Sequence, residues 1–363
     1  MLSPQLARKI VEQTMIRLNR NINIMNEKGI IIASGDSDRI NQIHEGALEV
    51  VHTGKPLIIY DTEIQNWQGT LPGINLPIRF MDRNIAVIGI TGHPDEIMEF
   101  GELVKMITEM MIEQSFLTEQ IEWKQRLKAQ VFDELVKTGY DRESVRQKLN
   151  LLEITLIPPY QVALVDLETG NKTEAELLKI FDDIFIHQDS VIIGFLHVNR
   201  IFILASRLKE DTFSHHVRLC LAKLKEKDIF ARIGLGLSVP EENHIFQSYE
   251  AANLALLAGD PEQQLITFPE VETKALITGL DERTKQQFQR RVLGNLSDKF
   301  IDTLDQLFKN NQHIGACAKS LFIHRNSLLY RLKRIKEETG YDPLTLNDAI
   351  TLQLAVWIRQ LQK

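Results

Sequence analysis

The residues with the most informative chemistry lie close together near the C-terminus, in the segment IGACAKSLFIHRNSLLYRLKRIKEE at 314–338. Residues 309–336 contain seven Lys or Arg and no Asp or Glu, although the formal net charge of the whole chain is −7. A concentrated run of cations in an acidic chain is typical of a contact with nucleic acid. Arg, Asn and Ser at the start of a helix can also reach base edges or phosphates from a major groove.

Two helices must position these side chains. Residues 314–321 are small and apolar and predict a first helix. A second helix is expected from about His324, because Leu328, Leu332 and Ile335 recur at spacings of four and three and make one buried stripe. Such a pair, separated by a short turn, is typical of a helix-turn-helix. Its exposed faces carry the candidate DNA-binding residues, which are Lys319, Arg325, Asn326, Ser327, Tyr330, Lys333 and Arg334.

A charged helix face surrounded only by solvent would give the same run of cations. The small-residue first helix, the short turn and the single sign of the charge occur together, and this combination favours DNA binding. We expect an all-α helix-turn-helix domain at 276–363, in which DTLDQLFKN forms a supporting helix.

Residues 1–95 predict a small α+β domain. An amphipathic helix at 1–19 precedes two β-rich runs, which flank a hairpin turn ending at Gly29. The segment DSDRINQIHEGALEVVHT predicts a helix that ends at Gly54, and short antiparallel strands follow. This order is typical of a PAS- or Cache-like fold, which holds its ligand between the sheet and the central helix.

Residues 96–138 predict a long connector helix. Eleven positions at alternating spacings of three and four, from 100 to 135, include eight apolar residues, which indicates an interrupted coiled-coil seam. A continuous helix of ~40 residues would extend ~60 Å and would suit a dimeric signalling protein. Two ordinary helices packed on the flanking domains are the alternative.

Three segments carry a resemblance to a known family. HRNSLLYRLKRIKEETG resembles the recognition helix of purine-catabolism-type and sugar-diacid regulators, with Ser327 where Thr is usual. IIASGDSDRINQIHEGA and PGINLPIRF resemble the sugar-diacid recognition domain of the same regulators. The resemblance implies a homodimeric transcription regulator, usually an activator. It would sense diacids such as glucarate, galactarate or glycerate-type acids and control genes for their uptake and catabolism.

A sugar diacid needs cations or N–H donors at both ends and polar groups between them. By resemblance to related dicarboxylate sensors, Arg39 and His44 would hold one carboxylate, and Arg79 is a second candidate cation. The hydroxyl and amide side chains could bond sugar hydroxyls, and a glycine allows close backbone approach. The candidate ligand-binding residues are Ser34, Arg39, His44, Gly73, Asn75, Arg79 and Thr91. Turn capping, loop ordering and surface exposure are the structural alternatives for these residues.

Residues 139–275 resemble the degenerate nucleotide-cyclase-like (GGDEF-like) α/β domain of these regulators. Diguanylate cyclases carry Gly-Gly-Asp/Glu-Glu-Phe in a hairpin where this chain has HVNRI at 197–201. Two-metal cyclase chemistry therefore lacks its ligands. The acids Asp166, Asp182 and Asp183 could be proposed as metal ligands, but solvated loop positions explain them equally well.

The composition is that of an ordinary globular protein, with 44% hydrophobic and 25% charged residues. Cys220 and Cys317 have no neighbours at metal-ligand spacing, so we expect no metal, no cofactor and a reducing compartment. No run approaches the ~18 apolar residues of a membrane span. We expect a cytoplasmic regulator without enzyme activity. A cyclase-like signalling enzyme and a scaffold that binds an acidic partner remain the alternatives.

Overall fold

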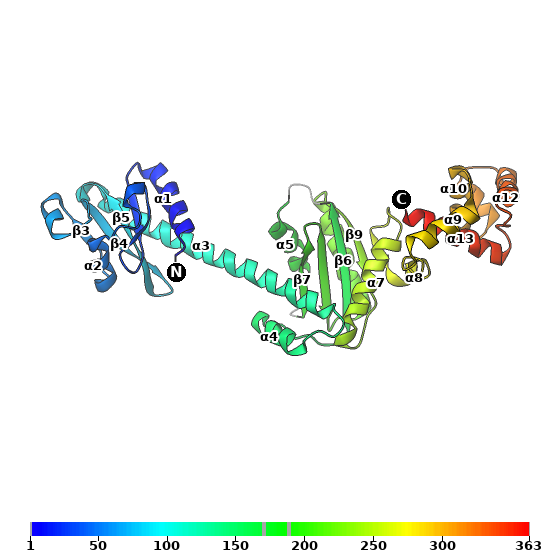
Figure 1. The fold of residues 1–363 in the computed structure, drawn as a ribbon, viewed down its shortest axis with the longest axis horizontal. Coiled ribbons are helices and arrows are strands. Elements are labelled where there is room, and N and C mark those ends of the chain that lie inside the picture. The colour runs from blue at the N-terminus through cyan, green and yellow to red at the C-terminus, as the bar shows by residue number, and fades with distance from the viewer. Residues whose placement is uncertain (1, 169–171, 187–189, 363) are drawn as a thin grey trace. The chain divides into compact units, whose positions relative to one another are not determined.

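The computed structural model describes residues 2–168, 172–186 and 190–362, and divides the chain into two compact units, 1–124 and 125–363 (Figure 1). Within the described residues the chain is mixed α+β, with one five-stranded sheet in each unit and a group of helices at the C-terminal end. This architecture confirms the predicted fold class.

The first unit is a five-stranded antiparallel sheet with helices on both faces. The strand order is β2-β1-β5-β4-β3. Its elements are α1 (Pro4–Leu18), β1 (Ile22–Met25), β2 (Ile31–Ser34), the 3-10 turn η1 (Ser37–Arg39), α2 (Glu45–Thr53), β3 (Leu57–Ile59), the 3-10 turn η2 (Asp61–Asn66), β4 (Gly73–Phe80), β5 (Arg83–Thr91) and the first part of α3 (Pro94–Leu135).

Side chains alternate between the two faces of this sheet, and each face has its own cover. Ile24 and Ile88 belong to the face that packs on α1 and α3. Met25 and Val87 belong to the opposite face, where they pack with Val50 of α2. The side of the sheet under α2 is therefore the one that a ligand between sheet and central helix would occupy.

The central helix α2 is shorter than the sequence predicts. Asp36 Oδ1 accepts a hydrogen bond from the backbone N–H of Asp38 at 3.1 Å and starts only a 3-10 turn. Asn41 then adopts a left-handed φ of 69°, which no α-helix can include. The α-helix begins at Glu45 and ends, as predicted, at Gly54 with a φ of 68°.

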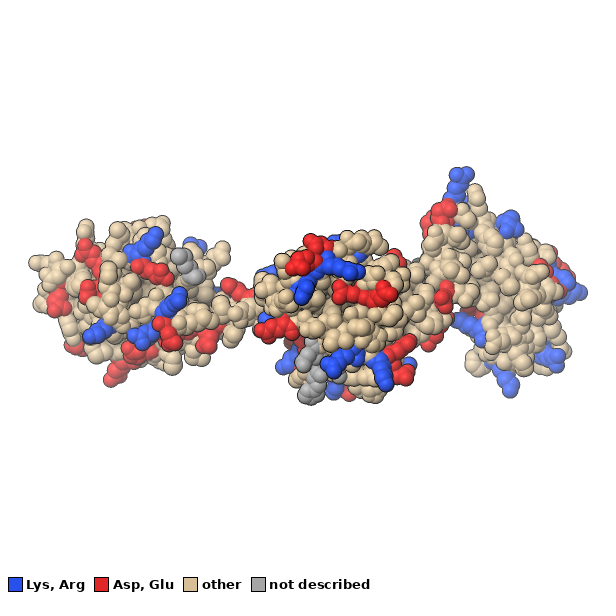
Figure 2. Space-filling model, turned by 90° about the horizontal axis from the view of Figure 1, so that it is seen from below, with Lys and Arg blue, Asp and Glu red and all other residues tan. Residues whose placement is uncertain are grey.

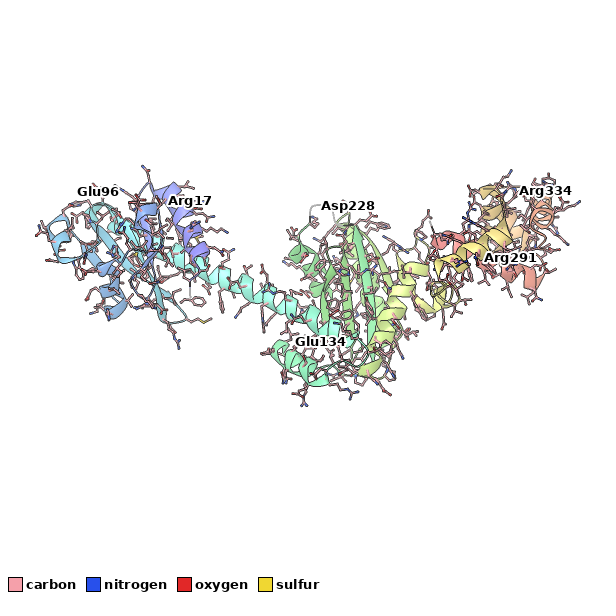
Figure 3. All side chains as sticks on the ribbon, viewed as in Figure 1. Arg17, Glu96, Glu134, Asp228, Arg291 and Arg334 are labelled. Carbon is pink, nitrogen blue, oxygen red and sulfur yellow. The ribbon has the colours of Figure 1, made fainter. Side chains whose placement is uncertain are left out.

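The connector is one continuous helix, α3, but the predicted seam does not run along all of it. Within the second unit, Val131 and Leu135 of α3 are fully buried in the core. Phe132 stacks on Phe202 there, with ring centroids 3.9 Å apart. Glu134, labelled in Figure 3, accepts a hydrogen bond at its Oε1 from Lys148 of the neighbouring helix α4 at 2.6 Å. The seam positions beyond 124 were therefore wrongly included.

The second unit begins with a sheet of order β10-β9-β6-β8-β7, in which only the β10–β9 pair of the described strands is parallel. One face packs on the end of α3 and on α7, and the other on α5 and α6. Its elements are α4 (Arg142–Leu152), β6 (Tyr160–Glu168), α5 (Glu174–Ile184), β7 (Val191–His197), β8 (Arg200–Ser206), α6 (Glu210–Glu226), β9 (Phe230–Leu235), the 3-10 turn η3 (Glu242–His244), α7 (Ile245–Ala258), β10 (Leu265–Thr267) and α8 (Phe268–Ala275).

The C-terminal helices enclose a separate small core. Leu304, Leu328 and Leu352 from three different helices are fully buried in it. The helices are α9 (Glu282–Leu293), α10 (Asp298–Lys309), α11 (Ile314–Ser320), α12 (Arg325–Thr339) and α13 (Leu346–Leu361). In the part of the chain that the structure describes, no helix is both long and apolar enough to cross a membrane.

Candidate functional site

The predicted helix-turn-helix is present as α11 and α12. Leu328, Leu332 and Ile335 are buried at 0–3% exposure, which confirms the stripe that the spacing predicts. The seven candidate DNA-binding residues named above are all exposed. The second helix therefore packs on one face and presents Asn326 and Tyr330 on the other.

Specific contacts fix the two ends of α12. His324 is its N-cap, and its Nδ1 accepts the backbone N–H of Asn326 at 3.2 Å. Gly340 ends the helix with a left-handed φ of 78°. Arg331 donates to Thr303 Oγ1 on α10 at 3.1 Å, so this cation anchors the helix instead of facing a partner.

Ion pairs neutralise much of the positive charge that the sequence shows. Arg334, labelled in Figure 3, lies 3.1 Å from carboxylate oxygens of both Glu337 and Glu338. Lys333 lies 4.0 Å from Glu337, and Lys336 lies 2.7 Å from Asp342. These acids follow the all-cationic window: Glu337 and Glu338 pair with cations one helical turn earlier, and Asp342 lies beyond the end of α12. The second half of α12 is therefore less positive than the sequence window suggests.

The free positive charge lies at the other end of the motif. Among the described residues, Lys319 at the end of α11 and Arg325 at the start of α12 form no ion pair. Figure 2 shows several separate blue patches on the C-terminal domain. The first turn of α12, with Arg325, Asn326 and Ser327, is thus the part that is best prepared to meet a polyanion.

In the first unit, a row of polar residues crosses the sheet face under α2. Ser34 pairs with Asn23, Asn23 with Gly89, and Gly89 with Asn75, so the row spans four strands. Ser34 Oγ donates to Asn23 Oδ1 at 2.6 Å. A Cβ at Gly89 would lie 2.9 Å from Asn75 Oδ1, so glycine at this position lets the Asn75 side chain approach the strand closely.

Asn75 is the unusual member of this row. The residue is only 3% exposed, and no side-chain hydrogen bond to another described residue accompanies this burial, although its amide atoms are not fully buried. Its amide is therefore available to a polar ligand.

His44 lies at the start of α2, as predicted, whereas Arg39 lies in the preceding 3-10 turn η1. Arg39 is 9% exposed, and its Nη2 donates to the carbonyl oxygen of Gly69 at 2.7 Å. His44 is the N-cap of α2, and its Nδ1 accepts the backbone N–H of Ala47 at 3.1 Å. Burial lowers the pKa of His44 to about 4, and the charge of Arg39 contributes to the shift. His44 is therefore a neutral ring at pH 7, with Nε2–H as its remaining donor.

Of the remaining predicted residues, Gly73 and Thr91 lie next to the polar row on its sheet face, and Arg79 lies away from it. Gly73 pairs with Thr91 on the same sheet face, two positions along β4 from Asn75. Arg79 lies six positions from Gly73, roughly 20 Å along the strand. It is exposed, and its Nη2 lies 3.4 Å from the carbonyl oxygen of Gly54. This geometry favours a role in capping the end of α2.

Sequence reasoning missed Asn23 and Gly89. The sequence does contain a signal for both, because Asn23 and Gly89 interrupt otherwise apolar strands at alternate positions that face inward. Asn23 is 2% exposed and directly bonded to Ser34. We group Asn23, Ser34, Asn75, Gly89 and Thr91 with Arg39 and His44 under the name sensor cup.

The middle domain has a charge pair where metal chemistry would need carboxylates. Arg200, in the β7–β8 hairpin, contacts Asp166 of β6 through Nε and Nη2 at 2.6 and 2.8 Å. The bond raises the pKa of Arg200, so the guanidinium stays charged. Asp166 lies on a strand, and Asp182 and Asp183 lie on α5, so the predicted loop positions were wrong. In the described segments, no group of three or more His, Cys, Asp or Glu is placed to hold a metal ion.

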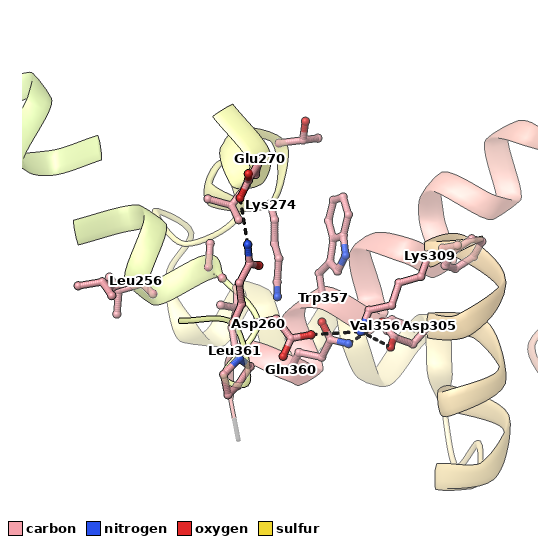
Figure 4. A pocket seen from close by; sticks show the side chains of 18 of the residues that line it. Leu256, Asp260, Glu270, Lys274, Asp305, Lys309, Val356, Trp357, Gln360 and Leu361 are labelled. Atoms are coloured by element: carbon pink, nitrogen blue, oxygen red, sulfur yellow. Dashed lines mark hydrogen bonds and ion pairs between the residues drawn. The ribbon is translucent and has the colours of Figure 1, made fainter. Parts of the chain in front are cut away.

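A cavity of about 830 Å³ in the second unit is lined by α7, α8, α10 and α13 (Figure 4). Lys309 Nζ lies 3.3 Å from Asp260 and 3.1 Å from Asp305, so its charge is matched within the cavity wall. No predicted site residue lines it.

The fold and the two sites define a class, namely regulators that carry a sensor domain and a helix-turn-helix domain on one chain. Three family profiles match in order: sugar diacid recognition at 2–135, a GGDEF-like domain at 138–258 and the PucR C-terminal helix-turn-helix at 300–358. The carbohydrate diacid regulator of Escherichia coli (strain K12) is 31% identical over 98% of this chain and 97% of its own length. The chain belongs to the carbohydrate diacid regulator family.

More distant relatives also match along the whole length. A protein of Haemophilus influenzae is 28% identical over 96% of each chain, and protein YsfB of Bacillus subtilis is 26% identical over 98% of each. The crystal structure of a regulator of polyketide synthase expression from Bifidobacterium adolescentis is 18% identical, covers 66% of this chain and 99% of its own, and has a TM-score of 0.31. That score is too low to support an inference.

The neutral state of His44 predicts a pH-dependent stability. As the pH falls from 7 to 5, the unfolded chain takes up a proton at His44 while the folded chain does not, because its pKa is about 4. The wild type should lose about 2 kcal/mol of unfolding free energy through this group. His44→Asn keeps an N-cap acceptor but cannot titrate. Urea denaturation of both proteins at the two pH values should show the smaller loss in the variant, and equal losses would contradict the prediction.

Proposed function

We propose that the protein is a cytoplasmic transcription regulator that binds a sugar diacid such as glucarate or galactarate in the sensor cup. It would control genes for uptake and catabolism of that acid, usually by activation. The observation that supports this effector is the polar row that spans four strands of the sheet and includes the available amide of Asn75. A sheet face that served only to pack against α2 would not need such a row of polar residues.

The cup offers the chemistry of a polyhydroxy dianion. Arg39 provides a fixed cation, and His44 provides a neutral N–H donor beside the N-terminus of α2, where the helix dipole favours negative charge. Asn23, Ser34 and Asn75 can bond hydroxyls in the middle. The E. coli relative is named for carbohydrate diacids, which supports the same ligand class.

Titration calorimetry of the full chain with a panel of six-carbon diacids tests the effector. Arg39→Gln should weaken binding of the preferred diacid by roughly 1.5–3 kcal/mol, because a charged hydrogen bond is lost while an N–H remains for the Gly69 carbonyl. Arg79→Gln removes an equal charge at the far end of β4 and should leave the affinity unchanged. An unaltered affinity for Arg39→Gln would remove Arg39 from the site.

The DNA contact is proposed for the first turn of α12. Arg325→Ala should lower affinity for a duplex enriched from a random library by roughly 1–3 kcal/mol if Arg325 reads a base. Diacid affinity should not change. Arg283→Ala, an exposed cation on α9, is the matched control for net charge. Fluorescence anisotropy at several salt concentrations measures the DNA affinity of both variants. Wild-type affinity in Arg325→Ala would exclude this residue as a contact.

We further propose a homodimer formed along α3. Within the first unit, Ile97, Val104 and Ile112 of this helix are buried in the sensor core. A second apolar stripe at heptad positions stays 40–61% exposed, and consists of Phe100, Leu103, Ile107, Met110, Leu117 and Ile121. An exposed stripe with this repeat is what the seam of a two-stranded coiled coil requires.

A charge placed in the seam should separate the dimer. Leu117→Glu puts a carboxylate at an apolar seam position and should give a monomer in light scattering at micromolar concentration. Leu117 is 52% exposed within one chain, so the change should not unfold the protomer. Thr118→Glu adds the same charge one residue away and should remain dimeric. A Leu117→Glu dimer would place the interface elsewhere.

For the middle domain we propose a structural role without cyclase activity. The Arg200–Asp166 pair supports this, because a guanidinium already satisfies the carboxylate that a divalent metal would need. Turnover of GTP in the presence of magnesium by the purified chain would favour the enzymatic alternative.

A further inference from the structure

Phe322, in the turn between α11 and α12, has an unexpected backbone conformation. Its φ is 53°, in the left-handed region. Its N–H donates to the carbonyl of Lys319, and the N–H of Ile323 donates to that of Ala318, both at 3.0 Å. These two bonds define a Schellman motif that ends α11, with Phe322 at the position where glycine is strongly preferred. A bulky aromatic residue there is strained.

The side chain of Phe322 does not pack in the core. It is 96% exposed, more than any other large hydrophobic side chain in the described residues. Its neighbours Leu321 and Ile323 are both packed against the core of the C-terminal domain. A strained backbone and an aromatic ring left in water both cost free energy. Such a combination indicates a contact with another molecule.

The position of Phe322 identifies that molecule. It lies between Lys319 and Arg325, two exposed cations of the motif that form no ion pair within the described residues. It also lies two residues before His324, the cap of α12. When the first turn of the second helix enters a major groove, the preceding turn is carried towards the same duplex.

We propose that Phe322 is a specificity-determining residue that makes an apolar contact with a thymine methyl group in the major groove. The methyl group is the apolar feature that distinguishes thymine there, and phenylalanine is one of the side chains that can read it. The proposal rests on the proposed DNA binding and adds a base preference to it. A phosphate contact of Lys319 would position the ring but carry no sequence information.

The test uses the full chain and a duplex that the wild type enriches from a random library. Phe322→Gly should raise the melting temperature, because glycine relieves the left-handed strain, and should weaken binding roughly tenfold. The dependence of affinity on salt should stay the same, since no phosphate contact is lost. Phe322→Leu should keep much of the affinity, because an apolar group remains.

Replacing thymines of the duplex one at a time by deoxyuridine removes only the methyl group. One such replacement should weaken the wild type but have no further effect on Phe322→Gly. Equal affinity of wild type and Phe322→Gly would overturn the proposal, and a loss of transcription without a loss of DNA affinity would assign the ring to a protein partner. If the wild type enriches no duplex at all, the proposed DNA binding fails as well.

Discussion

The whole arrangement depends on the apolar burial of a single helix in two separate cores. α3 contributes Ile97 and Val104 to the core of the first unit, and Val131 and Phe132 to that of the second. Its backbone hydrogen bonds run without interruption over 42 residues. Each buried side chain holds its part of the helix by roughly 1.5–3 kcal/mol. A change in packing within the sensor therefore acts on a helix whose other end is fixed, because removing its side chains from the core of the second unit would cost free energy.

The polar groups of the sensor are also surrounded by apolar, buried side chains. Asn23 and Asn75 lie on strands whose other side chains are almost entirely buried and apolar. The low polarity around them strengthens any hydrogen bond that they form and penalises any that they lack. An effector that bonds Asn75 in one arrangement of the sensor and not in another would have the differential affinity that a switch requires.

Several parts of this structure could be predicted from the sequence because they depend on local pattern. The buried stripe at Leu328, Leu332 and Ile335 follows from helical spacing alone, and the end of α2 follows from glycine at position 54, a common helix C-cap. The start of α2 could not be predicted, because the left-handed Asn41 interrupts a pattern that continues in the sequence. At the start of α2, local backbone geometry therefore outweighed the helix propensity of the preceding residues.

The sites were harder to predict than the elements, because they depend on distances in space. The pairing of Arg334 with Glu337 and Glu338 uses acids that lie outside the cationic window. The sequence indicated His44 as a ligand-binding residue, but its neutral state follows from burial, which no motif encodes. Asp166 could be judged as a metal ligand only once Arg200 was found against it.

The Arg200–Asp166 pair has a consequence for the physiology of such a regulator. A guanidinium is part of the chain, so it cannot be diluted, chelated or exchanged, and it stays protonated at any cellular pH. The charge of Asp166 is thus balanced from within the chain, without a divalent metal ion, whatever the supply of magnesium in the cell.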